Sequence, residues 1–378
     1  MKTYIAGNPW KNWVFARVET DEGIHGIGEG TVNAFAKTVE AAIHELSSLY
    51  IGMDPFQVEM IVQKMTRDVY AEGGQIHSSA VAAIEVACWD IIGKALGQPI
   101  YNLMGGRCHE KVRAYANGWY RGPRTPESFA EKAREVVRRG YTALKFDPFG
   151  SAHRIMDPDD EDLSVDIVAA VREAVGPKVD LLVEGHCRFS VSTAVKIARR
   201  LESYQPTWFE EPTHHQKIDA VVAVARQTSI PIATGESFSS KYEFAELLSY
   251  NAVHILQPEI FHLGGLHATR KVCDMIDAHY GVVAPHNAQG PVSTAICLQL
   301  AACTPNFFIQ EVFDEFNVDW EERVVDHPER VVDGYIAISE RPGLGIDLNL
   351  DEVMKHPYSP QYYIPLFKPG WERREAQS

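Results

Sequence analysis

The alternation of apolar and polar positions differs between the first hundred residues and the rest of the chain. Residues 13–30 alternate on both sides of a Thr-Asp-Glu-Gly turn, which predicts the two strands of a hairpin. Residues 35–49, 56–71 and 78–96 place apolar side chains three and four positions apart, as amphipathic helices do. The pattern therefore predicts an N-terminal α+β domain, which we place at residues 1–108.

Beyond residue 108, short apolar runs alternate with charged segments of helical periodicity. Strands that alternate with helices predict a parallel sheet of the α/β class, and eight units in about 220 residues match a (β/α)8-type barrel at residues 109–334. Residues 335–378 hold no further unit, so we expect a C-terminal segment that returns to the N-terminal domain. The predicted strands are VRAYAN near 112, YTALKF near 141, VDLLVE near 179, PTWFE near 206, IPIAT near 230, AVHILQ near 252, GVVAP near 281 and FFIQE near 307.

The chain is acidic, and this narrows the partners that it can bind. It carries 36 basic and 51 acidic residues, a formal net charge of −15, which repels phosphate backbones and anionic lipid surfaces. We therefore expect neither nucleic acid nor membrane partners. A small anionic substrate would need a metal ion or well-placed lysines beside it.

The cysteines and the N-terminus indicate where the protein works. Six cysteines lie scattered without a CxxC pair in a chain too large to depend on disulfides, which predicts reduced thiols. The N-terminus has no apolar signal segment, and the most apolar stretch, AVAAIEVACWDII, is interrupted by Glu85 and Asp90. We therefore expect a cytoplasmic protein.

Polar residues close most of the predicted barrel strands at regular intervals. From the third strand onward they lie 23 to 27 residues apart, which is about the length of one strand-helix unit. This spacing brings side chains that are distant in sequence to one rim of the barrel, where barrel enzymes keep their chemistry. The residues at these strand ends are Lys145, Glu184, Glu210, Glu236, Glu259, His286 and Glu311.

Three of these acids, Glu184, Glu210 and Glu236, end consecutive strands. Carboxylates a few ångströms apart repel by about 4 kcal/mol at an effective dielectric constant of about 20, and a hard cation removes that cost. Ligands that offer only oxygen suit Mg²⁺ better than zinc. A single such glutamate is equally well explained as a helix cap or as the partner of an arginine, but three in consecutive units favour a metal. Since neighbouring side chains on a strand point to opposite faces, only one of Glu210 and Glu211 can enter the barrel, and alternation leaves open which one.

Several motifs resemble the enolase superfamily, and within it the mandelate racemase-like branch. They cover nearly the whole chain: AIEVACWDIIGKALGQPIYNLMGG before the barrel, WFEEP at the fourth strand, TGES at the fifth, ILQPEIFHLGGL at the sixth, PHNAQGP at the seventh and IQE at the eighth. Members of this family carry a short N-terminal domain that caps the barrel, and the α+β unit fits that place.

The resemblance implies a role for each strand-end residue. It implies Mg²⁺ held by Glu184, Glu210 and Glu236, and removal of the proton next to a substrate carboxylate to give an enediolate stabilised on the metal. Lys145 and a proton on Glu311 would supply further positive charge. His286 resembles the general base of the family, oriented by Glu259, where the family more often has Asp. A lone histidine on a strand is usually a core residue, but one with an acidic partner is a better candidate for catalysis.

Two further positions favour dehydration over other reactions of this family. The third strand ends in EGHCRFS, so Glu184 and His186 share a strand face, and members that dehydrate aldonic acids resemble this, using that histidine as the acid for the leaving hydroxyl. The second strand ends in KFDP, whereas racemising and cycloisomerising members usually show two lysines there. We therefore expect Lys145 as an electrostatic contact and Asp147 as a substrate-binding residue.

The favoured reaction is Mg²⁺-dependent dehydration of a gluconate- or galactonate-like acid to a 2-keto-3-deoxy acid. Two alternatives stay open: an epimerase, racemase or cycloisomerase on the same scaffold, and a sugar-acid binding protein that has lost turnover. Family members often assemble through the capping domain, so a homo-oligomer is expected. The loops AGNPWKN and YAEGGQIHSS are candidates for substrate selection.

Two other patterns receive plainer interpretations. His214 and His215 are interpreted as an exposed loop pair in preference to a second metal site. The glycines of GIHGIGEG lack the GxGxxG spacing and lie in the hairpin, which argues against a dinucleotide site.

Overall fold

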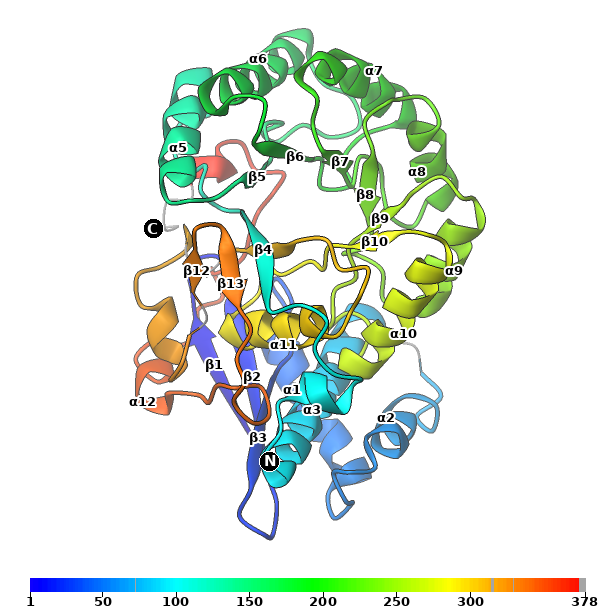
Figure 1. The fold of residues 1–378 in the computed structure, drawn as a ribbon, viewed down its shortest axis with the longest axis vertical. Coiled ribbons are helices and arrows are strands. Elements are labelled where there is room, and N and C mark those ends of the chain that lie inside the picture. Colours follow the sequence, from blue (N-terminus) through cyan, green and yellow to red (C-terminus); the bar gives the residue numbers. More distant parts are fainter. Residues whose placement is uncertain (72, 314–315, 329, 374–378) are drawn as a thin grey trace.

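The N-terminal part of the molecule is a three-stranded antiparallel sheet covered by helices (Figure 1). The computed structural model describes residues 1–71, 73–313, 316–328 and 330–373. The hairpin and the three predicted helices are confirmed, and an additional strand, β1, pairs along its whole length with β2. The elements are β1 (Lys2–Gly7), β2 (Asn12–Glu19), β3 (His25–Glu29), α1 (Ala36–Tyr50), α2 (Val58–Thr66) and α3 (Gly74–Leu96), followed by the short helix α4 (Ile100–Leu103).

Glycines on β3 allow α3 to lie directly on the sheet. A Cβ atom at Gly28 would lie 2.0 Å from the carbonyl oxygen of Ala83, and one at Gly26 would lie 2.0 Å from that of Ala87. The two glycines alternate along the strand, and the two alanines are one helical turn apart, so strand and helix meet backbone to backbone. These glycines therefore have a packing role.

Eight parallel strands follow and close into a barrel, which confirms the α/β prediction. They pair in chain order, β11 pairs with β4, and a bridge between Val283 and Phe307 joins β10 to the chain just before β11. The strands are β4 (Lys111–Ala116), β5 (Ala143–Phe146), β6 (Asp180–Glu184), β7 (Trp208–Glu210), β8 (Ile232–Thr234), β9 (Ile255–Leu256), β10 (Val282–Val283) and β11 (Gln310–Val312).

Seven helices connect these strands on the outside of the barrel, visible as the ring in Figure 1. Four of them begin at a residue whose side chain accepts a hydrogen bond from the first turn: Thr125, Asp157, Ser190 and Ser240. The helices are α5 (Pro126–Arg138), α6 (Pro158–Val175), α7 (Val191–Leu201), α8 (Ile218–Ala225), α9 (Lys241–Ser249), α10 (Leu266–Ala278) and α11 (Pro291–Ala302). No helix in the described ranges combines the length and apolar character needed to cross a bilayer.

Two buried carboxylates of the N-terminal domain bind the first turns of barrel helices. Glu29 accepts hydrogen bonds from Gly290 N and Ser293 N at the start of α11, over 2.8 and 3.0 Å. Glu85 on α3 accepts from the backbone N–H groups of residues 266 and 267 at the start of α10, both over 2.9 Å. Anions are favoured at helix N-termini, so these contacts fix the cap on the barrel. All residues of α11 are buried, as expected of a helix covered on two sides.

The C-terminal segment contacts both domains. Strand β13 (Tyr335–Ala337), paired with β12 (Val331–Val332), lies antiparallel to the start of β4, and a short helix α12 (Leu350–Val353) follows. The chain then crosses the cap, where Asn12 Nδ2 donates to Ser359 O over 2.8 Å. Near the end of its described part it reaches the barrel mouth, where Trp371 Nε1 donates to Gly150 O over 3.0 Å.

Candidate active site

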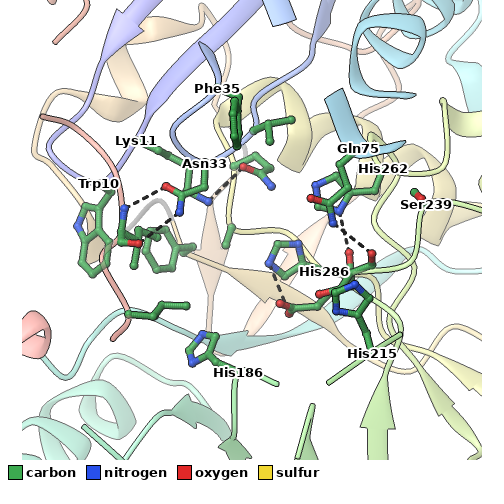
Figure 2. A pocket seen from close by; sticks show the side chains of 18 of the residues that line it. Trp10, Lys11, Asn33, Phe35, Gln75, His186, His215, Ser239, His262 and His286 are labelled. Carbon is green, nitrogen blue, oxygen red and sulfur yellow. Dashed lines mark hydrogen bonds and ion pairs between the residues drawn. The ribbon is translucent and has the colours of Figure 1, made fainter. Parts of the chain in front are cut away.

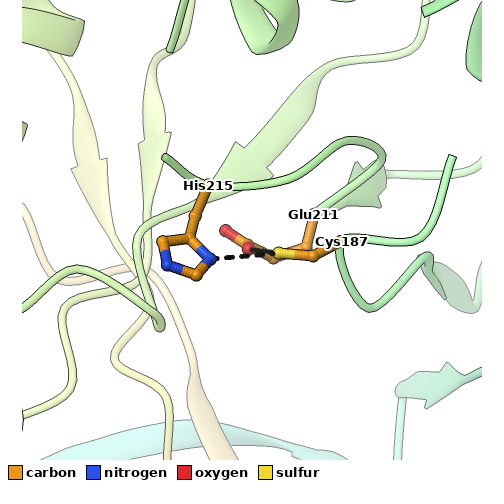
Figure 3. A group of neighbouring side chains, drawn as sticks. All are labelled: Cys187, Glu211 and His215. Atoms are coloured by element: carbon orange, nitrogen blue, oxygen red, sulfur yellow. Dashed lines mark hydrogen bonds between the residues drawn. The ribbon is translucent and has the colours of Figure 1, made fainter. Parts of the chain in front are cut away.

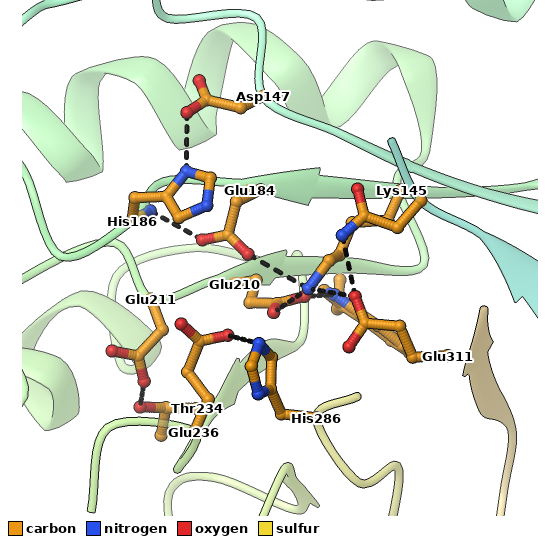
Figure 4. A network of polar contacts seen from close by, with 12 residues as sticks. Lys145, Asp147, Glu184, His186, Glu210, Glu211, Thr234, Glu236, His286 and Glu311 are labelled. Atoms are coloured by element: carbon orange, nitrogen blue, oxygen red, sulfur yellow. Dashed lines mark hydrogen bonds and ion pairs between the residues drawn. The ribbon is translucent and has the colours of Figure 1, made fainter. Parts of the chain in front are cut away.

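The three predicted metal acids converge at the carboxyl ends of β6, β7 and β8 (Figure 4). Glu184 and Glu210 are the last residues of adjacent strands and are paired in register. Glu236 lies two residues beyond β8. One carboxylate oxygen from each lies within 4.8 Å of the other two. The structure thus brings together side chains that are 26 residues apart in the chain, as the strand spacing predicts.

Lys145 on β5 lies among these acids with almost no exposed surface. Its Nζ atom is 2.6 Å from Glu210 Oε1, 3.0 Å from Glu311 Oε1 and 3.4 Å from Glu184 Oε2. Burial opposes the positive charge, but the neighbouring carboxylates outweigh it and raise the pKa of Lys145 well above its usual value. Lys145 is therefore a fixed cation, which fits an electrostatic contact and not a general base.

The acids fit a divalent metal. Glu184 Oε2 is buried and accepts no hydrogen bond from the described residues, although Lys145 Nζ is near. Burial raises the pKa of both Glu184 and Glu210 to about 7, because ionising several carboxylates in one dry site is unfavourable. Mg²⁺ prefers ligands that offer only oxygen, and a cation bound here would give the unsatisfied Glu184 Oε2 a partner.

A change in backbone direction at the end of β7 decides which of the two neighbouring glutamates enters the barrel. Glu210 enters the barrel, where Oε1 contacts Lys145 and Oε2 accepts from Trp208 Nε1 over 2.8 Å. Glu211 has φ of 39°, and its side chain turns to the next strand, where Gly235 N donates to Oε1 over 3.0 Å. Glu210 is thus the metal candidate of the pair.

His286 and Glu259 lie together beside Glu236, one of the three acids that form the acid cluster with Glu184 and Glu210. His286 Nδ1 is 2.6 Å from Glu259 Oε2, and its Nε2 is 3.7 Å from Glu236 Oε2. The glutamate therefore reaches the imidazole, although the family more often uses the shorter aspartate here. Burial lowers the pKa of His286, but Glu236 and Glu259 outweigh this and raise it to about 9.

His186 forms a second histidine-carboxylate pair. Its Nδ1 lies 2.6 Å from Asp147 Oδ2, and its backbone N–H donates to Glu184 Oε1 over 2.6 Å. Asp147 also binds the guanidinium of the buried Arg188. It has no exposed surface and does not line the pocket, which differs from the substrate contact expected from the sequence. The side chain lies behind His186, because Arg188 holds it there.

Glu311 on β11 accepts hydrogen bonds from Asn117 Nδ2 over 2.8 Å and from Asn287 N over 2.7 Å. Burial disfavours its ionised form, but Lys145 and His286 outweigh burial and lower the pKa of Glu311 to about 2. This shift favours the ionised form of Glu311, whereas the family resemblance implies a proton there. The positive charge at this position comes from Lys145.

A cavity of about 560 Å³ opens above these residues, between the cap and the barrel (Figure 2). This volume is typical of small-molecule sites. The barrel contributes Lys145, His186, Glu236 and His286, whereas both candidate loops of the cap contribute lining residues, among them Trp10, Lys11 and Gln75. The C-terminal segment adds Ile364, Leu366 and Trp371.

Lys11 is a site residue that was not predicted individually, although its loop, AGNPWKN, was a candidate for substrate selection. It is only 5% exposed, and its Nζ donates to Gln289 Oε1 over 3.2 Å. Burial lowers its pKa, although Glu259 and Glu236 oppose this. A lysine within the apolar run NPWKNWVF was the sequence signal for this residue. Its partner Gln289 lies 278 positions away in the chain, so the contact could not be predicted.

Family models and individual relatives of this chain agree with one another. Residues 5–105 match the mandelate racemase / muconate lactonizing enzyme N-terminal domain, and residues 128–353 match the enolase C-terminal domain-like family. D-gluconate dehydratase from Thermoproteus tenax is 35% identical and covers 96% of this chain and 73% of that protein. D-gluconate/D-galactonate dehydratase from Picrophilus torridus is 32% identical and covers 96% and 93%.

Solved structures agree with the sequence relatives. Mandelate racemase/muconate lactonizing enzyme from Jannaschia sp. CCS1 superposes with a TM-score of 0.89 at 32% identity, covering 95% of this chain and 97% of that one. A member of the enolase superfamily from Salmonella Typhimurium gives 0.88 at 30% identity, covering 94% and 97%. The chain therefore belongs to the enolase superfamily, in its mandelate racemase and muconate lactonizing enzyme family.

Proposed function

We propose that the protein is a Mg²⁺-dependent dehydratase that converts an aldonic acid into a 2-keto-3-deoxy acid. The observation that carries this proposal is a pair of histidines, His286 and His186, each bound at Nδ1 by a buried carboxylate and each lining the pocket beside Glu236 or Glu184. Two such groups suit a reaction that removes one proton and delivers another. The similarity to D-gluconate and D-galactonate dehydratases supports the same class of substrate.

Proton removal is assigned to His286. Because Glu259 accepts the hydrogen bond at Nδ1, the ring in its neutral form presents its Nε2 lone pair on the side of Glu236, toward the acid cluster. A cation held by Glu236 would offset the charge by which this acid raises the pKa of His286, and would so favour the neutral form. Nε2 takes the proton from C2 of the substrate, next to its carboxylate. The electron pair of the C2–H bond moves onto the carboxylate, which gives an enediolate.

The new negative charge needs cations placed in advance. Lys145 is charged and held by Glu210 and Glu311 at the floor of the pocket. Mg²⁺, when bound to Glu184, Glu210 and Glu236, supplies further positive charge at this point. Such preplaced charge is usually the largest contribution to catalysis.

Loss of the C3 hydroxyl is assigned to His186. With Nδ1–H donating to Asp147, the imidazolium form of His186 carries its second proton at Nε2 and gives that proton to the leaving oxygen, which leaves the ring neutral. The enediolate electron pair forms the C2–C3 double bond, and the C3–O bond breaks to release water. The resulting enol takes up a proton at C3 and becomes the 2-keto-3-deoxy acid.

The substrate class, the oligomeric state and the cellular location are also proposals. A small anionic sugar acid is the expected partner, and Lys11 and Lys145 give the acidic chain local positive charge to receive it. A homo-oligomer and a cytoplasmic location stay predictions. All six cysteines are free thiols, in keeping with the expected absence of disulfides.

One experiment tests dehydration against epimerisation. Gluconate and galactonate are incubated with the protein and Mg²⁺ in deuterated water, and both keto-acid formation and deuterium at C2 of recovered substrate are measured. A keto acid is expected with wild type, and C2 exchange without keto acid with His186→Asn. Exchange or inversion at C2 without keto acid in wild type would favour an epimerase, and no reaction with a full set of aldonic acids would favour a binding protein.

A further inference from the structure

Cys187, Glu211 and His215 form a second group of potential metal ligands, which we call the thiol cluster (Figure 3). Cys187 comes from the loop after β6, and Glu211 and His215 come from the loop between β7 and α8. One donor atom of each lies within 4.8 Å of the other two. The reaction proposed above uses none of the three. His214 is exposed, as the sequence predicts for this loop pair, whereas its neighbour His215 is partly buried and lines the pocket.

The separations within the thiol cluster match a small tetrahedral metal site. Cys187 Sγ lies 3.7 Å from His215 Nδ1. Sulfur and nitrogen bound to Zn²⁺ at about 2.3 and 2.05 Å in a tetrahedral arrangement are about 3.6 Å apart. Cys187 Sγ also donates to Glu211 Oε2 over 2.5 Å. That contact has to lengthen by about 1 Å when a cation replaces the thiol proton.

Glu211 is held so that one oxygen faces the other two donors. Its Oε1 accepts from Thr234 Oγ1 and from Gly235 N, which fixes the carboxylate. Its Oε2 accepts from the Cys187 thiol alone among the residues that the structure describes. Cys187 and Glu211 have φ of 57° and 39°, in the left-handed region that residues other than glycine rarely adopt. Such backbone conformations are concentrated at functional sites.

We propose that the thiol cluster is a second metal site, which takes Zn²⁺ or another thiophilic divalent ion in preference to Mg²⁺. Thiolate, imidazole and carboxylate are zinc ligands. The site formed by Glu184, Glu210 and Glu236, in contrast, offers only the oxygens that Mg²⁺ prefers. Binding breaks the Sγ–H bond of Cys187, forms an Sγ–metal bond and releases the proton to solvent. Three protein ligands leave a fourth position for water or a further ligand, and His215 is the member of the cluster that lines the pocket.

Cobalt titration tests the proposal, because a cobalt-thiolate bond gives a near-ultraviolet charge-transfer band that oxygen and nitrogen ligands do not produce. Reduced, full-length protein is kept in excess Mg²⁺, which occupies the oxygen site, and is titrated with Co²⁺. We expect a thiolate band that saturates at one equivalent and is removed by Zn²⁺ but not by more Mg²⁺. The readout does not depend on dehydratase activity, so failure of the proposed function leaves the result interpretable.

Two variants and one control decide the outcome. Cys187→Ser should abolish the band, whereas Cys108→Ser, at an exposed thiol, should leave it unchanged. His215→Ala changes a partly exposed side chain and should weaken Co²⁺ binding at least tenfold, which keeps the proposal testable if Cys187→Ser does not fold. Absence of the band in wild type, its survival in folded Cys187→Ser, or unchanged affinity in His215→Ala would overturn the proposal.

Discussion

His186 Nδ1 lies 2.6 Å from Oδ2 of Asp147, a carboxylate with no exposed surface. The same separation joins His286 Nδ1 to Oε2 of the equally buried Glu259. The two histidines therefore have the same local construction in the loops after two different strands, β6 and β10, with Nε2 as the ring atom left for substrate. A buried carboxylate fixes the ring and the tautomer in each pair, so changing either acid should affect one chemical step and not the other.

Asp147→Asn should lower keto-acid formation by about 10- to 100-fold, because the amide no longer holds His186 as the carboxylate does. Exchange of the C2 proton with deuterated solvent should continue at close to the wild-type rate, since Glu259 and His286 are unchanged. Both rates are measured by proton NMR on one sample. Equal loss of exchange and product would mean that Asp147 supports the whole site and not His186 in particular.

His286→Asn should lower both C2 exchange and product formation by about 10² to 10⁴, or about 3 to 5.5 kcal/mol in the barrier, if the imidazole is the general base. The asparagine keeps polar atoms near Glu259 and should leave the fold intact, which circular dichroism checks. A change of less than about tenfold would assign the base to another residue.

The barrel and its rim could be predicted because they follow from periodicity. Each strand-helix unit has nearly the same length, so the acids at residues 184, 210 and 236 could be placed on one rim without any contact information. Strand β1 was not predicted, because its buried and exposed residues do not alternate as in a typical strand. The hydrogen bonds of its pairing with β2 stabilise it instead. Long-range pairing of this kind leaves little trace in a local pattern.

Side-chain directions at the strand ends could not be predicted, because the chain leaves the strand geometry there. Alternation fails at Glu211, where φ of 39° turns the residue away from the position that a regular strand would give it. Asp147 shares a strand face with Lys145 in the sequence pattern, but Arg188 and His186 hold it behind the pocket wall. The position of Asp147 thus depends on two residues of the loop after β6.

Metal-free protein should lose stability as the pH rises, and Mg²⁺ should restore it. Burial raises the pKa of Glu184 and Glu210 from 4.5 to about 7. A carboxyl with a raised pKa in the folded state contributes stability that is complete below pH 4.5 and is lost as the pH rises through 7. The increase in melting temperature caused by Mg²⁺ should therefore be larger at about pH 8 than at about pH 5.5, at equal ionic strength.

Differential scanning fluorimetry with and without Mg²⁺ measures this effect. Glu236→Gln should remove most of the Mg²⁺-dependent increase, whereas Glu45→Gln, at an exposed position of α1, should keep it. The same Mg²⁺-dependent increase at both pH values would contradict the assignment of the three acids as ligands.

Lys11 offers the clearest test of the cap as part of the substrate site. It is a buried lysine that lines the cavity from the N-terminal domain, and the barrel acids Glu259, Glu236 and Glu311 favour its positive charge against burial. Hydrogen bonds to charged groups contribute about 1.5 to 3 kcal/mol, so Lys11→Met should raise KM for an aldonic acid by about 10- to 100-fold. The turnover number should change much less, since Lys11 does not contact His286 or His186 in the structure. Lys37→Met removes an exposed lysine of α1 and is the matched control, for which unchanged kinetics are expected. A loss confined to kcat in Lys11→Met would instead assign the lysine to the chemical step, because uniform binding affects KM and a contact made only in the transition state affects kcat.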